Sequence, residues 1–461
     1  MIGLSSRLAL SRIKTNRSGL DVLAVLAFAI TTLLALTVAG GTNMFYGRWQ
    51  NPPASLERII ENTGNPYTSA TDLAGMYLTL AIIACAILVV PILSLGAGAA
   101  RLGASGRSKR LASLRLIGMT GVEVVVMSVI ETIILTLGGA LLGGIVFVLS
   151  LPLWRFISFH DQPLTPGDMV GPWWLNLAVL GVILLLSALS TIIGLRQVVI
   201  SPLGVAKRET PKALQFWRVI VFVAAIIIFA FTAQSFNAIT SDFMAYLFMG
   251  GVIMFMLFTV NLVGPWLIQL VARPLVRTSN SATLLAMRRL VSQPREAWRN
   301  VGGLAFIGFI AAFTLTLPDA PDDPLFALQV KDIGMGIIIT LAIGLLVAAT
   351  STLINQAAYA VDRAEQTLAL TRMGTPRKVF AGARYRQVLL PLITTLGVSI
   401  PLGLLVMRLL IVGTPAETAQ TNNIVTLIVV ILIGIALSIA AASATRPIET
   451  RILTTDYRRN D

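Results

Sequence analysis

The sequence predicts an all-α integral membrane protein with ten membrane-spanning helices, and three observations support this fold class. The chain is 56% hydrophobic and only 12% charged, whereas soluble domains carry about 25% charged residues. Its apolar runs are continuous and reach the roughly 20 residues that a spanning helix needs, while the strands of a barrel would alternate apolar and polar residues. Of the 35 Lys and Arg residues, 30 lie in every second gap between these runs.

That alternation predicts the orientation of the chain, because loops on the cytoplasmic side retain Lys and Arg. Both ends of the sequence belong to the basic set, so we expect both termini in the cytoplasm. The net charge of +14 is then explained by inner loops near anionic lipid head groups. Without a soluble basic domain we expect no nucleic-acid partner. The alternate gaps, which we expect on the outer side, contain only five Lys and Arg residues: Arg48, Arg58, Arg155, Lys331 and Arg408.

In chain order, the spans are separated alternately by basic inner segments and by short outer loops. The longest outer loop, 43–71, is expected to contain a short helix from Ser55 to Asn62. The acidic, Pro-rich loop 318–332 is expected to be a solvated turn, and a cation site is the less favoured alternative. No outer loop is long enough for a large extracellular domain with its own core. We place the ten spans at residues 20–42, 72–98, 120–150, 173–195, 217–236, 243–270, 301–317, 333–354, 386–411 and 424–443.

Two pairs of similar segments predict an internal repeat. Residues 8–13 resemble 285–290, and each is a basic stretch that leads into a span. Residues 107–118 resemble 363–374 at a constant offset, and each lies between the second and third spans of its set of four. We therefore expect two related four-helix bundles with two intervening helices, which divides the chain into residues 1–200, 201–280 and 281–461.

The second pair of segments allows two interpretations. Leucines recur on one helical face with basic residues beside it, and a glycine that permits a turn ends each segment. The segments could be interfacial helices with snorkelling Arg side chains, or docking helices that receive force from a cytoplasmic motor, which the duplication favours. The residues expected to couple to such a motor are Arg107, Lys109, Arg110, Leu114, Arg115, Gly118, Arg363, Glu365, Leu370, Arg372 and Gly374.

The pattern R-x-K-R-x-x-x-L-R-x-x-G-M-T at 107–120, followed by Glu131 and paired glycines within 138–144, resembles the FtsX-like permease domain. The segment 363–375, followed by Gly397 and Gly403, is similar. In topology the chain resembles the BceB- and MacB-like membrane subunits of ABC transporters, the type VII mechanotransmission class. It departs from them in lacking their large outer domain.

The resemblance implies a permease subunit in a bacterial plasma membrane. It also implies that two copies of a separate cytoplasmic ATPase bind the ATP and Mg²⁺. This chain has no Gly-Lys-Ser/Thr phosphate loop, so we expect it to carry no cofactor and to be no enzyme itself. The expected substrate is an amphiphile reached among the membrane lipids: a lipid, a lipid-linked precursor or an antimicrobial compound, which would link the protein to antibiotic resistance.

Two other functions fit the same sequence. One is a non-transporting mechanotransmitter that regulates a small envelope partner. The other is an ATP-independent secondary transporter or flippase, which would need charged groups and broken helices near the middle of the membrane.

Two ionisable residues inside predicted spans are candidates for intramembrane roles. A carboxylate at the bilayer centre costs roughly 3 kcal/mol, so Glu131 should be protonated, form a structural hydrogen bond, or pair with Arg384 or Arg386 of the opposite repeat. Arg408 is expected to snorkel outward, and contact with an anionic substrate head group is the alternative.

The remaining distinctive residues predict structure rather than chemistry. The only histidine, His160, lies in an outer loop, so no zinc or other metal site and no catalytic triad is expected. The only cysteine, Cys85, lies in a span and can form no disulfide within the chain. The glycines of 138–144 lie inside a span as well, where small residues permit close helix packing.

Overall fold

A computed structural model describes residues 19–63, 69–105, 120–200, 216–234, 242–295, 324–362, 364–410 and 421–445, with single positions between 297 and 312. Of the residues that the structure describes, 91% are helical. In the described part, six helices are long and apolar enough to cross a membrane. The predicted class, an all-α multi-pass membrane protein, is confirmed at this level.

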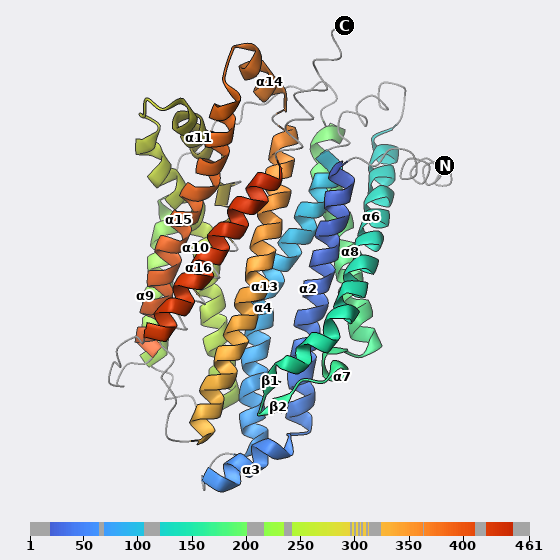
Figure 1. Cartoon of the computed structure of the whole chain (residues 1–461), viewed down its shortest axis with the longest axis vertical. Coiled ribbons are helices and arrows are strands. Elements are labelled where there is room, and N and C mark those ends of the chain that lie inside the picture. Colours follow the sequence, from blue (N-terminus) through green and yellow to red (C-terminus); the bar gives the residue numbers. More distant parts are fainter. Residues whose placement is uncertain are drawn as a thin grey trace.

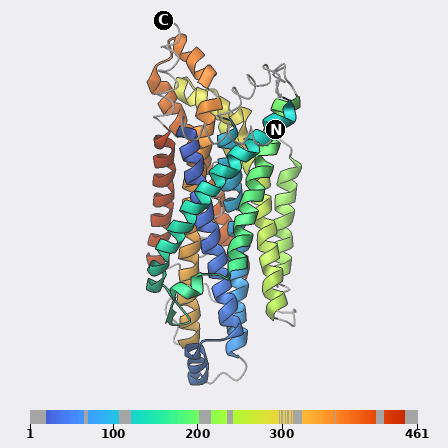
Figure 2. The same cartoon turned by 90° about the vertical axis from the view of Figure 1, so that its right-hand side faces the viewer.

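The first half of the chain forms four long helices that run roughly along the long axis of the molecule (Figures 1 and 2). Helix α2 packs against α4, α6 and α8, and α8 also contacts α4 and α6. Their bounds are α2 Gly19–Gln50, α4 Ala70–Ser105, α6 Gly121–Ser150 and α8 Trp173–Ile200.

The connections of this half at the end near residue 50 are short but structured. The short helix expected in the first loop is present as α3, Ala54–Thr63. After α6 the chain forms the 3₁₀ helix η1, Leu151–Phe156, and then a small hairpin with strands β1, Ser158–Phe159, and β2, Gln162–Pro163. The strands pair antiparallel, Phe159 opposite Gln162. Helix α7, Pro166–Met169, follows with a capping box from Thr165.

The second half contains further long helices and two short ones. Helix α13 packs on α16 and, across the middle of the molecule, on α4; α15 packs on α11 and α16; and α10 packs on α9 and α11. The bounds are α9 Trp217–Gln234, α10 Asp242–Leu275, α11 Ser281–Ser292, α13 Pro324–Asp362, α14 Ala364–Arg372, α15 Arg377–Leu410 and α16 Thr421–Ala444.

Several helices extend beyond the spans that the apolar runs predict. Helix α2 continues to Gln50 rather than 42, α4 to Ser105 rather than 98, and α13 starts at Pro324 rather than 333. Apolar runs report the part of a helix that would lie in lipid, whereas backbone hydrogen bonding continues into polar flanks. The span expected at 301–317 falls largely outside the described residues.

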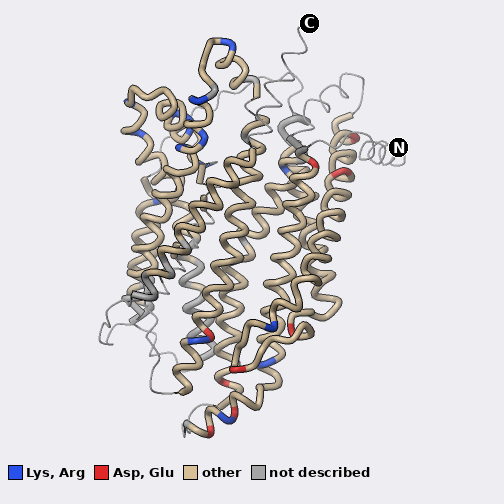
Figure 3. The backbone as a smooth tube through the Cα atoms, in the orientation of Figure 1, with Lys and Arg blue, Asp and Glu red and all other residues tan. Residues whose placement is uncertain are grey.

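Among the described residues, most charged positions lie towards the two ends of the bundle (Figure 3). Cations gather at the end that carries α11 and α14, which we call the basic end. The opposite end carries α3 and the β1–β2 hairpin, and we call it the hairpin end. Four of the five cations assigned to outer gaps lie in segments at the hairpin end, so the structure separates the charges as their spacing predicts: Arg48, Arg58, Arg155 and Lys331.

Glycines bring helices α2 and α6 into close contact. A Cβ atom on Gly139 would lie 2.5 Å from Phe28 Cβ and 2.7 Å from the backbone oxygen of Val25. A Cβ on Gly143 would clash with the backbone oxygen of Ala29. The close packing predicted for the glycines of 138–144 is therefore confirmed for Gly139 and Gly143, whereas a Cβ on Gly138 or Gly144 would meet no atom within 4 Å.

A similar contact joins α15 to the helical positions around 305–312. A Cβ on Gly403 would lie 2.6 Å from both Ala312 Cβ and Phe309 O. Val301, Ala305 and Phe309 belong to one buried cluster with side chains of α13 and α15. In both halves, therefore, a glycine of the helix that follows the basic-end connection approaches the backbone of the first helix.

Candidate functional site

The second predicted coupling segment forms α14 at the basic end (Figure 1). The helix contains Glu365, Leu370 and Arg372, and it ends in a Schellman motif. In that motif the amide of Thr375 donates to Leu370 O at 3.1 Å, and the amide of Gly374 donates to Thr371 O at 3.0 Å. Gly374 has φ +87°, a left-handed conformation that glycine adopts without steric cost.

The end of α14 and the residue after it are exposed. Arg372 is exposed and the adjacent Met373 is 73% exposed, while Leu370 is half-buried. The first copy of the segment, with Arg107, Lys109, Arg110, Leu114, Arg115 and Gly118, lies outside the described residues, as does Arg363.

The predicted intramembrane residues are not brought together. Glu131 is buried in α6, whose neighbours are α2 and α8. Arg384 is buried in α15 and donates a hydrogen bond to Ala442 O of α16, at 3.5 Å. Helices α6 and α15 lie on opposite sides of the bundle (Figure 1), so the expected pairing of Glu131 with Arg384 or Arg386 is wrong. Arg408 lies in α15, near its end.

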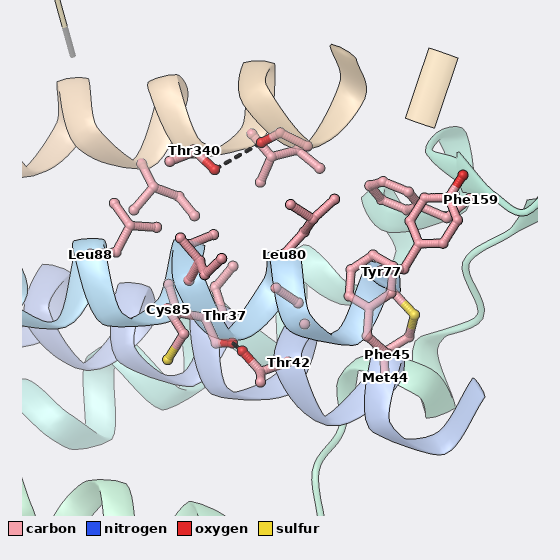
Figure 4. A pocket seen from close by; sticks show the side chains of 18 of the residues that line it. Thr37, Thr42, Met44, Phe45, Tyr77, Leu80, Cys85, Leu88, Phe159 and Thr340 are labelled. Carbon is pink, nitrogen blue, oxygen red and sulfur yellow. Dashed lines mark hydrogen bonds between the residues drawn. The ribbon is translucent and has the colours of Figure 1, made fainter. Parts of the chain in front are cut away.

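A different group of residues forms a cavity towards the hairpin end. The cavity has a volume of about 280 Å³ and lies between α2, α4 and α13, closed at one end by residues of η1, the hairpin and α7. Its walls are almost entirely apolar. Figure 4 shows Tyr77, Phe45 and Phe159 at one end of the cavity, with Leu88 towards the other. The cavity lies where the two halves of the chain meet, because α4 and α13 form opposite walls.

Polar groups concentrate at one end of this cavity. Asp332 of α13 and Tyr77 of α4 both line it, and they are only 1% and 3% exposed. The Tyr77 hydroxyl and the Asp332 carboxylate lie close enough to interact, although the angles and distances between them do not meet hydrogen-bond geometry. Asp332 Oδ2 accepts a 2.8 Å hydrogen bond from the backbone amide of His160. Asp332 Oδ1 and the Tyr77 hydroxyl have no hydrogen-bond partner in the described part of the chain.

The hairpin turn holds His160 against these residues. His160 and Asp161 both have φ +56°, which matches the type I′ turn that closes two-residue hairpins but costs non-glycine residues roughly 1–2 kcal/mol each. Tertiary contacts offset that cost. Ser55 Oγ donates to His160 O at 2.8 Å, and the imidazole meets the Tyr77 ring edge-on at 4.4 Å between centroids.

The tautomer of His160 follows from its neighbour Arg48. One guanidinium nitrogen of Arg48 donates to Phe159 O at 2.6 Å and lies 3.5 Å from His160 Nδ1. Because a guanidinium only donates, Nδ1 must accept, and the neutral ring carries its proton on Nε2. Burial, and secondarily the Arg48 charge, lower the pKa of His160 from 6.5 to about 4. His160 is therefore neutral at pH 7, with a buried Nε2–H that lacks a partner among the described residues.

A second and larger cavity adjoins the first. It has a volume of about 830 Å³ and is lined by residues of α2, α4 and the start of α8, including the aromatic side chains of Tyr46, Trp49 and Trp174. Thr42 and Cys85 line both cavities. These two side chains thus lie between the larger cavity, which we call the groove, and the first cavity between the two halves of the chain.

Sequence reasoning missed this cluster. The acids of loop 318–332 were expected in a solvated turn, which is wrong for Asp332, since α13 begins at Pro324 and buries it. His160 was correctly placed in a loop, but its burial depends on Arg48, Ser55 and Asp332, which are distant in sequence. The sequence signal that could have indicated this cluster is the position of Asp332, directly before the long apolar run at 333–354.

Comparison with known proteins does not assign this chain to a family. The chain matches no family model and no curated protein sequence. The resemblance to FtsX-like permeases therefore rests on motifs and topology.

Proposed function

We propose that this chain is the permease subunit of an ABC transporter, in which separate cytoplasmic ATPase subunits drive the export or extraction of an amphiphile from the membrane. The observation that carries the proposal is α14. It is a short helix placed between two long helices at the basic end; its last residue Arg372 and the following Met373 are exposed, and Gly374 forms the turn after it. Such a helix provides a surface on which a soluble motor can push.

The packing of the long helices supports two related bundles. In the first half α8 contacts both α4 and α6, and in the second half α16 contacts both α13 and α15. Gly139 and Gly403 make the corresponding close approaches to the first helix of each half. The proposed spans number ten in a four, two, four arrangement: α2, α4, α6 and α8; α9 and α10; and a helix within 301–317 with α13, α15 and α16.

In this arrangement the basic end faces the cytoplasm and the hairpin end faces outward, in agreement with the retention of Lys and Arg on the cytoplasmic side. The termini are cytoplasmic and the membrane is the bacterial plasma membrane. The segments described at the hairpin end form no large domain, which supports a substrate that reaches the protein through the bilayer. The groove beside α2, α4 and α8 and the apolar cavity behind it provide a route of that kind.

Force on α14 would be transmitted through α13 to the cavity. Helix α13 runs from the cavity wall at Asp332 to Asp362, next to α14. ATP-driven closure of two ATPase subunits would move α4, α6 and α8 against α13, α15 and α16. Since α4 and α13 form opposite walls, this movement changes the shape of the cavity.

The test is co-expression with an ABC ATPase encoded beside this chain. Charge reversal at Arg107, Arg110 and Arg363 should abolish co-purification of the ATPase and its stimulation by the permease. Reversal of the hairpin-end cations Arg58 and Arg155 is the matched control and should preserve both. Retention of a fully coupled complex in the first set of variants would refute the docking role.

The same experiment separates the alternatives. A complex that hydrolyses ATP without moving any amphiphile would indicate a non-transporting mechanotransmitter. Transport by the chain alone, unaffected by the ATPase, would indicate a secondary transporter or flippase.

A further inference from the structure

We propose that the cavity between α2, α4 and α13 binds an amphiphile with a primary ammonium head group, with Asp332 as its acceptor and the apolar walls around its chain. This inference deepens the proposed function, on which it rests for the idea of transport, by naming the chemical class of the substrate. It is carried by the charges, the unpartnered polar atoms and the shape of the cavity.

The charges around the polar end leave one carboxylate without a cation at ion-pair distance, although Lys331 and Arg48 act on it electrostatically from farther away. Arg48 lies 3.7 Å from the Asp168 carboxylate, and Lys331 lies 3.3 Å from that of Asp161. Asp332 forms no ion pair within the described part of the chain. Two cations thus face three carboxylates, and the unpaired one is the most buried. A buried carboxylate is stable only when it is protonated or paired, so a ligand cation would complete the cluster.

Two buried oxygens without partners indicate that the bound cation should carry hydrogen-bond donors. Asp332 Oδ1 can only accept when ionised, and the Tyr77 hydroxyl can accept as well as donate. Both residues line the cavity, and both atoms lack partners among the described residues. An ammonium group offers three N–H donors and can satisfy both oxygens at once. A quaternary ammonium has the same charge but no donor.

The surroundings argue against an anion or a bound metal ion. An anionic head group would meet the Asp332 carboxylate, while the Arg48 guanidinium is already occupied by Phe159 O and Asp168. Within the described residues, no three or more His, Cys, Asp or Glu side chains group together as ligands for a metal ion. The apolar walls instead require a hydrocarbon chain, and the cavity of about 280 Å³ lies near the lower end of the range for small-molecule sites, about 300–1,000 Å³.

The single cysteine provides the assay. Cys85 lines the cavity, so an occupant should slow its reaction with N-ethylmaleimide, and no other thiol reacts because Cys85 is the only cysteine. The full chain is reconstituted alone in phosphatidylcholine nanodiscs at pH 7. Protection is measured against the mole fraction of dodecylamine, dodecyltrimethylammonium, dodecanol or dodecyl sulfate. A charge-assisted hydrogen bond corresponds to roughly tenfold or more in affinity.

We expect dodecylamine to protect Cys85 at about one-tenth or less of the mole fraction that dodecanol requires, with dodecyltrimethylammonium in between. In Asp332→Asn this preference should fall to about twofold or less. Asp161→Asn is the matched control, because that carboxylate lies at the same end but its side chain is 64% exposed, and it should keep the preference. If Asp332→Asn does not fold, Tyr77→Phe serves as the second variant and should reduce the preference by removing one acceptor.

Equal protection by dodecylamine and dodecanol in the unmodified chain would overturn the proposal. So would the strongest protection by dodecyl sulfate, or a full amine preference in Asp332→Asn. The assay contains no ATPase, so its outcome is independent of whether the docking experiment succeeds. Failure of the coupling proposal would leave a membrane protein that binds amines, and failure here would leave a permease with another substrate.

Discussion

Replacement of Gly139 by alanine tests whether the α2–α6 contact is a real constraint on the bundle. The added methyl group would lie 2.7 Å from Val25 O, whereas ordinary van der Waals contact begins at 3.4 Å. It would lie closer still to Phe28 Cβ, at 2.5 Å, so the two helices must separate by about 3.4 − 2.5 = 0.9 Å at this point. Because the obstructing atoms include backbone, a change of side-chain rotamer cannot relieve the clash.

The expected cost follows from two opposing effects. Overpacking of this kind destabilises by about 1–3 kcal/mol, and a gap of 0.5–1 Å along the interface forfeits a quarter to a half of the dispersion energy there. In a helix interior alanine is favoured over glycine by about 1 kcal/mol. Gly138→Ala receives the same helical benefit without the clash, since nothing lies within 4 Å of a Cβ at that position. The stability of the two variants should therefore differ by about 1–3 kcal/mol.

The measurement is unfolding of each purified variant by increasing mole fractions of sodium dodecyl sulfate in mixed micelles, followed by tryptophan fluorescence. Gly139→Ala should unfold earlier than the unmodified protein, and Gly138→Ala at the same point or later. Identical midpoints for the two variants would show that the helices do not approach closely here.

Three further predictions concern the hairpin and α14. The free-energy gap between the unmodified protein and His160→Asn should shrink as pH falls from 6.5 to 4. In the folded state the pKa of the His160 imidazole is about 4, so as pH falls the unfolded state takes up the proton first and the folded state loses about 3 kcal/mol of stability. Denaturant midpoints of the two proteins at pH 7.5 and 4.5 test this. The same difference in stability at both pH values would contradict it. Arg48→Gln should speed amide hydrogen exchange in the hairpin about tenfold or more, because the charged donor to Phe159 O is lost, and unchanged protection by mass spectrometry would contradict it. Gly374→Ala should destabilise the α14–α15 turn by about 1–2 kcal/mol and weaken ATPase co-purification, whereas Gly397→Ala, with open space and no left-handed backbone, should do neither.

The strained hairpin turn connects the two halves of the chain. His160 belongs to the loop after α6, and Asp332 belongs to α13 of the second half. A movement of α13 relative to the hairpin would stretch or break this hydrogen bond. Residues held in unfavourable backbone conformations often mark functional sites, and here the strain lies at the contact that closes the cavity.

Much of the architecture follows from local sequence patterns. The fold class, the described long helices and the separation of Lys and Arg were predictable, because burying a helix in lipid demands a long apolar run whatever its neighbours are. The helix of the first outer loop and the turn at Gly374 were also predictable, since amphipathic spacing and a glycine after a helix act over a few residues.

The candidate site was not predictable from those patterns, because its residues come from segments far apart in the chain. Arg48, Tyr77, His160 and Asp332 meet only through the packing of α2, α4 and α13 with the hairpin. The same reason explains the error over Glu131. Charge and spacing suggested Arg384 as its partner, but only tertiary packing decides which helices are neighbours, and it places α6 and α15 on opposite sides of the bundle.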